Sequence, residues 1–195
     1  NYQENIILKV TNLNLKGHYK DVSFKLHAGE VLGITGVIGS GRESICRSIF
    51  GFLKPDTGEI EIFNKLKIIE SPSVAVKNSI GYIPKERRYE GIVLFLPVSS
   101  NITLANIKKI IKNYLINFKL EKIISNEWIQ KLKIKTPNIS TLCLNLSGGN
   151  QQKVVLSKWM NANSKIIILD HPTRGLDVGA KEEVYELIRS MSKSG

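Results

Sequence analysis

The stretch GVIGSGRE, which begins at Gly36, has the glycine spacing of a phosphate-binding loop. That pattern has four free positions between two glycines, followed by Lys and then Ser or Thr. Gly36, Gly39 and Gly41 match its first part, because glycine lets consecutive backbone N–H groups turn toward phosphate oxygens at the start of a helix. Arg42 and Glu43 depart from its second part. The loop therefore predicts a nucleotide site with altered chemistry.

The two departures change different parts of that chemistry. Arg42 keeps a positive charge for phosphate but replaces a compact ammonium by a wide planar fork. Glu43 puts an anion where a hydroxyl would ligate magnesium. Ser44 does not simply replace that hydroxyl, since a shift of one residue on a helix turns the side chain by about 100°. We include Ser40 and Ser44 in the candidate loop and expect weak nucleotide binding.

A second candidate group follows a fully apolar strand, KIIILD, predicted over 165–170. The chain order is a strand, a glycine loop, a helix and later a buried strand that ends in Asp. This order is typical of a parallel α/β sheet that binds nucleotide at the carboxyl ends of its strands. We expect Asp170 to lie beside the loop and to hold the magnesium of a nucleoside triphosphate, directly or through water.

The elements that must position these residues are short. Apolar runs predict four strands, at 6–10, 22–26, 31–35 and 59–63. A stretch over 99–135 has helical apolar spacing, through Ile107, Ile110, Ile111 and Leu115 and then Ile123, Ile124, Trp128 and Leu132. A Gly-rich turn capped by Ser147 predicts a helix over 151–160, and a last helix is expected over about 179–192.

The composition fits one soluble globular domain in a reducing cytosol. The 195 residues carry a net charge of +11, which would suit a nucleic-acid or anionic-membrane partner. Lys outnumbers Arg 22 to 6 and no block of five basic residues occurs, so we favour codon bias of an AT-rich genome over either partner. Cys46 and Cys143 are far apart and lack metal-site spacing. The longest apolar run, Ile92–Leu96, is too short to span a membrane.

Two later segments carry a family resemblance. LNLSGGNQQKVVLSKWM (144–160) and IIILDHPTRGLDVGAK (166–181) resemble the signature and Walker B regions of ATP-binding cassette (ABC) ATPases. With the arginine-bearing loop, IGYIPKERRYEG (80–91) and NITLA (101–105), the chain resembles the second nucleotide-binding half of tandem ATP-binding subunits for bacterial import of ribose, galactose, xylose or arabinose.

The resemblance implies an α/β P-loop NTPase fold with a parallel core sheet, an antiparallel β subdomain and an inserted helical subdomain. It implies one nucleotide-binding domain over 1–195, with a helical and signature subdomain over 92–160 inserted in the ATP-binding core. The family's switch residue lies about 30 positions after the Walker B Asp, so the domain is expected to be incomplete at its C-terminus and the chain to be a piece of a longer tandem subunit.

The signature residues are expected to act in trans. The resemblance makes Ser147, Gly148, Gly149, Asn150 and Gln151 the segment that offers a hydroxyl, backbone N–H groups and a helix N-terminus to the γ-phosphate of an ATP held by a partner cassette.

Four further positions take roles from the resemblance. Asp170 becomes the Walker B carboxylate for Mg²⁺, and Asp177 the D-loop residue at the dimer interface. Tyr19 corresponds to an adenine-stacking aromatic, with an ordinary packing aromatic as the alternative. His171 stands where the family carries the glutamate that polarises the attacking water. A histidine can act as a base near neutral pH, but its reach and charge differ, and we interpret it mainly as a sign of lost hydrolysis.

The partners also follow from the resemblance. The loop 84–91 corresponds to the segment that contacts membrane permease subunits, with Lys85, Glu86 and Arg87 as the contact residues, although the branch usually has Gln or Glu where Lys85 stands. The other partner is a second cassette, the cofactors are ATP and Mg²⁺, and no nucleic acid is expected. The location implied is peripheral, on the cytoplasmic face of the bacterial membrane.

The leading hypothesis is therefore the second ATP-binding cassette of a sugar importer, with an intact signature and degenerate Walker motifs. A non-catalytic regulatory nucleotide-binding module and a soluble ABC ATPase working on ribosomes or nucleic acid are the alternatives. A dinucleotide-binding turn at GSGRES, with Glu61 20 residues beyond Gly41, lacks its third glycine.

Overall fold

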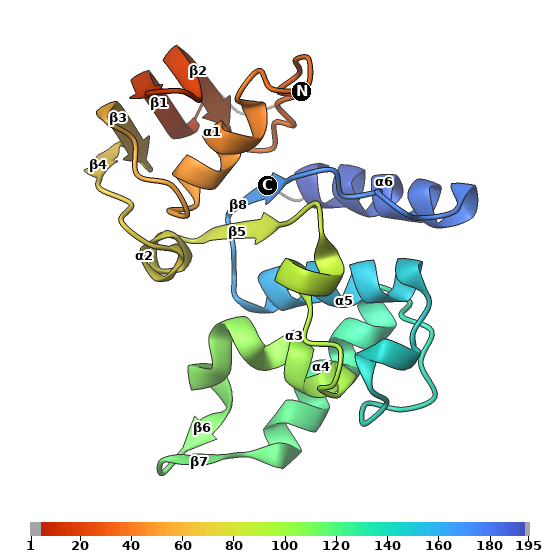
Figure 1. The fold of residues 1–195 in the computed structure, drawn as a ribbon. Helices are drawn as coiled ribbons and strands as arrows, with labels where there is room; N and C mark the ends of the chain where they lie inside the picture. Colours follow the sequence, from red (N-terminus) through yellow and green to blue (C-terminus); the bar gives the residue numbers. More distant parts are fainter. Residues whose placement is uncertain (1–4, 194–195) are drawn as a thin grey trace. The chain divides into compact units, whose positions relative to one another are not determined.

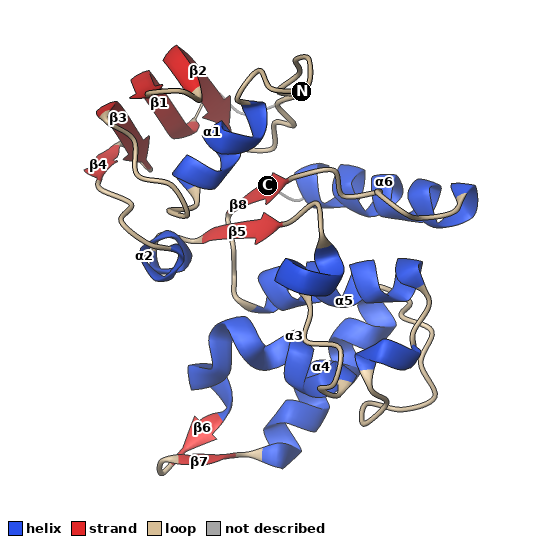
Figure 2. Cartoon of the chain, viewed as in Figure 1, coloured by secondary structure: helices blue, strands red, loops and turns tan. Residues whose placement is uncertain are grey.

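The computed structural model describes residues 5–193. Contacts divide the chain into a first unit, made of the chain up to Ile80 together with the residues from Ile188 onward, and a second unit, Gly81–Leu187. Strands dominate the first unit and helices the second (Figure 2). Among the described helices, none combines the length and the apolar character that crossing a membrane requires.

The first unit is built on an antiparallel sheet with the strand order β2-β1-β3-β4 (Figure 1). Its strands are β1 (Ile6–Leu15), β2 (Tyr19–His27), β3 (Thr57–Ile62) and β4 (Lys65–Lys67). Val10 of the central strand pairs with Phe24 on one side and Ile60 on the other. Side chains alternate between the faces of a strand, so Leu8, Val10 and Ile60 are buried. Three of the four strands predicted from apolar runs are confirmed here.

The strand predicted over 31–35 is wrong, because residues 31–38 form no strand in the structure. Val31 is 62% exposed and Ile34 is 39% exposed. A strand needs a neighbour that supplies backbone hydrogen-bond partners, and the sheet of this unit pairs β2, β1, β3 and β4 without this segment. The apolar run therefore has the composition of a strand, but no neighbouring strand pairs with it.

Two helices complete the first unit. Helix α1 (Arg42–Ile49) follows the glycine loop and buries Ile45 and Ile49. Helix α2 (Pro72–Lys77) begins with proline, whose missing N–H costs nothing at a helix start, and the Ser71 hydroxyl accepts a hydrogen bond from the Val74 N–H.

The second unit contains a pair of apolar strands whose arrows run the same way in Figure 1. They are β5 (Ile80–Ile83) and β8 (Ile166–Leu169), which form a two-stranded sheet. The Asp170 N–H donates to the Ile83 carbonyl at 2.9 Å, so the pairing continues to the residue after β8. The strand predicted over 165–170 is confirmed.

Helix α5 (Gly148–Asn161) is the core of the second unit. Val154, Val155 and Leu156 are almost completely buried. The other helices are α3 (Val98–Thr103), α4 (Phe118–Lys131) and α6 (Val178–Lys193). The π-helix η1 (Arg87–Gly91) and the 3₁₀ segments η2 (Leu104–Ile110), which is kinked at Asn106, and η3 (Cys143–Asn145) are short. The helices predicted over 151–160 and 179–192 are confirmed, the first with an earlier start.

The helical prediction over 99–135 is only half right. Helix α4 confirms its second half, but Ile111 and Leu115 lie in a hairpin of β6 (Ile111–Lys112) and β7 (Leu115–Ile116). The turn residues Asn113 and Tyr114 have φ of 50° and 65°. A two-residue turn of this kind needs positive φ at both positions and interrupts a helix.

Candidate functional site

The phosphate-loop glycines of the first unit adopt conformations that require glycine. Gly39 and Gly41 both have φ of 85°, and Gly41 is the N-cap of α1. A Cβ added at Gly41 would lie 2.0 Å from the His18 carbonyl oxygen, which no side chain tolerates. The glycines therefore let the loop pack against β2 and turn directly into the N-terminus of α1, where backbone N–H groups suit a phosphate.

The side chains of the loop contact their own surroundings. Arg42 donates from Nη1 to the Gly36 carbonyl. Glu43 lies in the first turn of α1, where a negative charge stabilises the helix N-terminus. The Ser44 hydroxyl lies 2.8 Å from His18 Nδ1, and the Ser40 N–H donates to the Val37 carbonyl at 3.1 Å. His18 is a neighbour of the loop that sequence reasoning missed, because nothing in the motif points to it.

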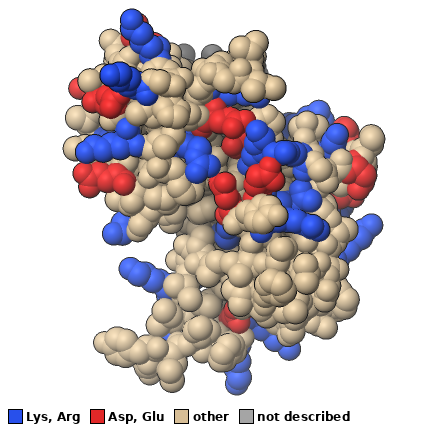
Figure 3. Space-filling view, viewed as in Figure 1, with Lys and Arg blue, Asp and Glu red and all other residues tan. Residues whose placement is uncertain are grey.

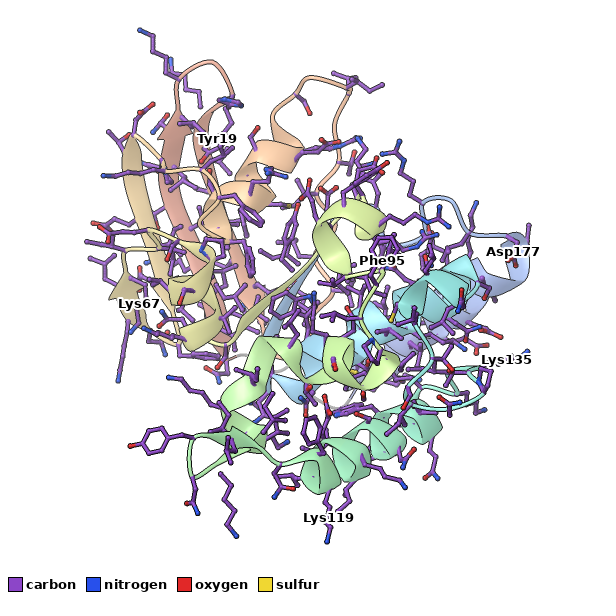
Figure 4. All side chains as sticks on the ribbon, turned by 60° about the horizontal axis from the view of Figure 1, so that its bottom comes forward. Tyr19, Lys67, Phe95, Lys119, Lys135 and Asp177 are labelled. Carbon is purple, nitrogen blue, oxygen red and sulfur yellow. The ribbon has the colours of Figure 1, made fainter. Side chains whose placement is uncertain are left out.

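Tyr19, labelled in Figure 4, begins β2 in the first unit. It is only 9% exposed, and its hydroxyl donates to Ser48 Oγ of α1 at 2.7 Å. Burial raises the pKa of Tyr19, and the hydrogen bond with Ser48 acts in the opposite direction. These contacts tie β2 to α1, and adenine stacking by this ring stays a prediction.

In the second unit, Asp170 is held by two side chains. Its carboxylate is buried, with Oδ2 accepting a 3.0 Å hydrogen bond from the Tyr82 hydroxyl and Oδ1 lying 2.7 Å from His171 Nδ1. His171 has φ of 49°, the left-handed conformation, and turns directly toward its neighbour. Sequence reasoning missed Tyr82. Its hydroxyl is the one polar side-chain group in the apolar strand IGYI, and that was the signal that could have found it.

The signature hydroxyl is positioned by an amide. Asn150 donates from Nδ2 to Ser147 Oγ at 2.9 Å, and its Oδ1 accepts from the Lys135 N–H at 2.7 Å. Ser147 is the N-cap of α5, but its side chain makes no capping hydrogen bond. The Gln151 N–H donates to the Ser147 carbonyl at 2.9 Å, so the helix N–H groups before it have no acceptor within α5.

The two signature glycines permit close packing. A Cβ added at Gly148 would lie 2.6 Å from Arg87 Nη2, and one at Gly149 would lie 2.9 Å from the Cβ of Ala180 in α6. Gln151 is fully buried and donates from Nε2 to the Cys143 carbonyl at 3.0 Å. Gln151 therefore anchors α5 inside the unit.

Asp177, labelled in Figure 4, caps helix α6. Its Oδ1 accepts a hydrogen bond from the Ala180 N–H at 2.9 Å, and its residue surface is exposed. This is the geometry of an N-cap aspartate, which stabilises a helix start by about 1 kcal/mol. This cap uses Oδ1 of the Asp177 carboxylate, which lies at an exposed position.

The loop 84–91 is joined to the segment after Asp170. Glu86 forms an ion pair with Arg174, and Arg87 donates from Nη1 to the Arg174 carbonyl at 2.8 Å. Burial lowers the pKa of Arg87, with Arg88 adding to the effect. Lys85 is half-buried. Sequence reasoning nominated Glu86 and Arg87 but not their common partner.

On the face shown in Figure 3, the charges are mixed rather than gathered in one block. Figure 3 shows Lys and Arg side chains interspersed with Asp and Glu on the face in view. Charge alone therefore does not distinguish a nucleic-acid surface on that face.

Comparison with known proteins places these features in a family. The model of the family described as ABC transporter matches residues 19–174, which include the glycine loop, the signature and Asp170. The chain belongs to the ABC transporter family. The signature role of the LSGGN turn at Ser147 and the Walker B role of Asp170 stay predictions from the resemblance.

Curated relatives cover nearly all of this ABC chain. It is 43% identical to the ribose import ATP-binding protein RbsA of Clostridium tetani over 192 residues, which are 97% of the chain and 38% of the relative. It is 45% identical to RbsA of Caldanaerobacter subterraneus subsp. tengcongensis over 191 residues, again 97% and 38%. The chain thus spans about two fifths of the length of these relatives.

Solved structures confirm the ABC cassette fold. A nucleotide-free ATP-binding cassette from an ABC transporter matches with a TM-score of 0.79 at 22% identity, over 97% of this chain and 78% of that one. A part of the ABC transporter complex cbiONQ from Clostridium perfringens matches with a TM-score of 0.79 at 25% identity, over 98% and 75%. The α/β P-loop fold class predicted from the sequence is confirmed.

Proposed function

We propose that this chain is the second ATP-binding cassette of a tandem subunit that powers import of a ribose- or galactose-type monosaccharide. Relatives at 41–45% identity that bear names of ribose or ribose/galactose import ATP-binding proteins support the substrate class. The chain covers 37–38% of their length, as one of two cassettes would. We further propose that residues 92–160 are the helical and signature subdomain of this cassette.

ATP and Mg²⁺ are the cofactors in this proposal. The positive φ of Gly39 and Gly41, and the close approach of His18 to Gly41, fit a loop shaped for phosphate. Asp170 supplies the carboxylate oxygens that magnesium prefers. Bound MgATP supplies the phosphoanhydride bond whose hydrolysis drives transport, and Gly36, Arg42 and Ser44 belong to the loop that would hold its phosphates.

The observation that carries the proposal is the signature geometry. Asn150 fixes the Ser147 hydroxyl beside a helix N-terminus whose first N–H groups have no acceptor within α5. A hydroxyl and helix N–H groups together suit an anionic phosphate. We propose that this turn completes the ATP site of a partner cassette, with Asp177 at the shared interface and Tyr19 on the adenine side of its own site.

We propose that the ATP site of this half itself hydrolyses weakly or not at all. His171 replaces the glutamate that would polarise water, and its Nδ1 lies 2.7 Å from Asp170 Oδ1. Glu43 replaces the magnesium-binding hydroxyl. The first change removes the group that would activate the water, and the second removes a magnesium ligand, whereas the loop glycines and the LSGGN turn are unchanged.

The same proposal gives the loop 84–91 its role. Lys85, Glu86 and Arg87 would contact the permease at the cytoplasmic face of the membrane, where the cassette is peripheral. The ion pair of Glu86 with Arg174 and the hydrogen bond of Arg87 to the Arg174 carbonyl support transmission from this contact to the segment that carries His171.

The test mixes the purified chain with a partner cassette that has an intact phosphate loop and glutamate. We expect Mg²⁺-dependent binding of a fluorescent ATP analogue, little phosphate release by the chain alone, and turnover in the mixture. Ser147→Arg should abolish that turnover, whereas Asn126→Arg on the exposed surface of α4 should leave it unchanged.

Two results would contradict parts of the proposal. Equal turnover with and without Ser147→Arg would refute the trans role and favour a regulatory nucleotide-binding module. Rapid phosphate release by the unmodified chain alone would refute the degenerate assignment. His171→Glu should raise turnover at the chain's own site by about a hundredfold or more, within the about 10²–10⁴-fold range of positioned acid–base groups.

A further inference from the structure

The β6–β7 hairpin of the second unit presents apolar side chains to solvent. Its strands pair Ile111 with Ile116 and Lys112 with Leu115. Leu115 is 74% exposed and Phe118, which follows the hairpin, is 72% exposed. Ile111 and Ile116 are also exposed, at 44% and 42%. The second unit therefore leaves much of the apolar surface of this short ribbon uncovered.

The hairpin nevertheless has a fixed position. The Asn117 N–H donates to the Ile110 carbonyl at 2.8 Å, which closes its base. Ile110 is 1% exposed, and the Asn117 side chain accepts from the Leu120 N–H as the N-cap of α4. The exposed tip therefore projects from two anchored ends.

The tip carries an aromatic residue where the backbone favours glycine. Tyr114 has φ of 65° and is 100% exposed. Asn-Gly is the preferred pair for such a turn, because glycine adopts positive φ without cost, whereas a bulky residue there is strained. A fully exposed ring gains no burial within the second unit that would offset the strain.

Lysines flank this apolar hairpin along the chain. Exposed basic side chains flank it on η2, on the hairpin itself and on the first turn of α4: Lys108, Lys109, Lys112, Lys119 and Lys122. Lys119, labelled in Figure 4, points away from α4. The one carboxylate between residues 104 and 122 is Glu121, which is 8% exposed and accepts hydrogen bonds from Ser100 and Thr103.

Figure 3 agrees with this distribution: the end of the second unit that carries β6 and β7 in Figure 1 is mostly uncharged, with Lys and Arg side chains at its margins. This mostly uncharged end differs from the mixed charges elsewhere on the face in view.

We propose that the β6–β7 hairpin docks on an anionic phospholipid surface. Aromatic and aliphatic side chains enter the interfacial region of a bilayer, and lysines reach the phosphate groups with their long stems. The charge favours lipid over a second copy, because two hairpins flanked by exposed lysines repel each other. This contact is additional to the permease contact of the proposed function and does not depend on sugar import or on ATP.

The test measures cosedimentation of the purified chain with phosphatidylcholine vesicles, with and without an equimolar share of phosphatidylglycerol. We expect binding to the anionic vesicles that falls as salt rises. The Lys108→Glu, Lys112→Glu, Lys119→Glu variant should weaken it by at least about a hundredfold, since each lysine near an anionic surface contributes about fivefold and each added glutamate is repelled. Tyr114→Ser with Leu115→Ser should weaken it about tenfold.

Each hairpin variant has a control that makes the same change in net charge, or removes the same number of exposed apolar side chains, elsewhere in the chain. Lys20→Glu, Lys25→Glu, Lys65→Glu changes three exposed lysines of the first unit, and Phe95→Ser with Leu66→Ser removes two exposed apolar side chains outside the hairpin. Neither should change vesicle binding more than about twofold. In Tyr114→Trp, the added tryptophan emission should shift to the blue with anionic vesicles only.

Three outcomes would overturn the proposal. One is absence of vesicle binding, and another is equal loss of binding in hairpin and control variants. The third is a sedimentation experiment without lipid in which the chain dimerises and Tyr114→Ser makes it monomeric, which would assign the hairpin to a second copy. Vesicle binding that persists in Ser147→Arg and His171→Glu separates this proposal from the cassette function.

Discussion

The Tyr82 hydroxyl donates a 3.0 Å hydrogen bond to Asp170 Oδ2, across 88 residues of chain. Tyr82 lies in β5 and Asp170 directly follows β8, so the pairing of these two strands sets the distance between the groups. Both residues are buried. A buried carboxylate depends on its hydrogen bonds, and this bond holds the candidate metal-binding side chain in one orientation.

Removing the Tyr82 hydroxyl should therefore cost stability. Tyr82→Phe keeps the ring but leaves Asp170 with one donor fewer, and we expect the free energy of unfolding to fall by about 1.5–3 kcal/mol. Urea unfolding measures it. Tyr185→Phe is the matched control, because that hydroxyl lies 3.2 Å from Thr173 Oγ1 at an exposed position and should change stability by less than about 0.5 kcal/mol. Equal effects of the two changes would contradict the role assigned to Tyr82.

Gly149 should be intolerant of a methyl group. Its added Cβ would meet the Ala180 Cβ at 2.9 Å, so Gly149→Ala should lower the free energy of unfolding by about 1–3 kcal/mol. Adding Ala180→Gly should restore most of that loss, and the double-mutant cycle measures the coupling. Gly179→Ala, whose Cβ would have its nearest contact at 3.5 Å, should be neutral or stabilising. Failure of Ala180→Gly to rescue would contradict this contact.

Lys158 should make stability depend on pH in the alkaline range. Burial lowers the pKa of Lys158 to about 8, and its ammonium donates to the Gly91 carbonyl. Between about pH 8 and the ordinary pKa of 10.5, the unfolded chain holds this proton and the folded chain does not. The contribution of Lys158 to the free energy of unfolding therefore rises with pH across that window, by about 3 kcal/mol in total, and is constant below it.

Lys158→Met removes that titration. Urea unfolding at several pH values from 7.5 to 10 should show a stability difference between the unmodified chain and the variant that grows in favour of the unmodified chain as pH rises. Lys77→Met, at an exposed position on α2, should run parallel to the unmodified chain. A difference that stays constant over this range would show that Lys158 keeps its proton when folded.

The two cysteines should differ in reactivity. Cys143 is fully buried and burial raises the pKa of its thiol to about 11, so only about one molecule in a thousand carries the thiolate at pH 8. Cys46 is half-buried on α1. A thiol reagent at pH 8 should label one cysteine rapidly and the second only on unfolding. Cys46→Ser should remove the rapid phase, and its persistence would contradict the assignment.

The sequence by itself determined the local elements and the candidate residues. Four consecutive apolar residues, Ile166 to Leu169, predict a buried strand, and the periodic apolar residues after Ser147 predict α5. The signature and the residues Asp170 and His171 were found because a motif is a pattern of neighbours in the chain. The fold class followed from the order of these segments.

Only the tertiary structure decided which distant groups meet. Packing brings together the partners of three hydrogen bonds, which no local pattern encodes. Tyr82 donates to Asp170, Arg87 donates to the Arg174 carbonyl, and the Lys135 N–H donates to Asn150. Predictions from composition were also wrong where the availability of backbone hydrogen-bond partners decides whether a strand forms. Residues 31–35 have strand residues but no ladder, and Tyr114 turns the chain at a position where propensity expects glycine, because the anchored ends at Ile110 and Asn117 fix the hairpin.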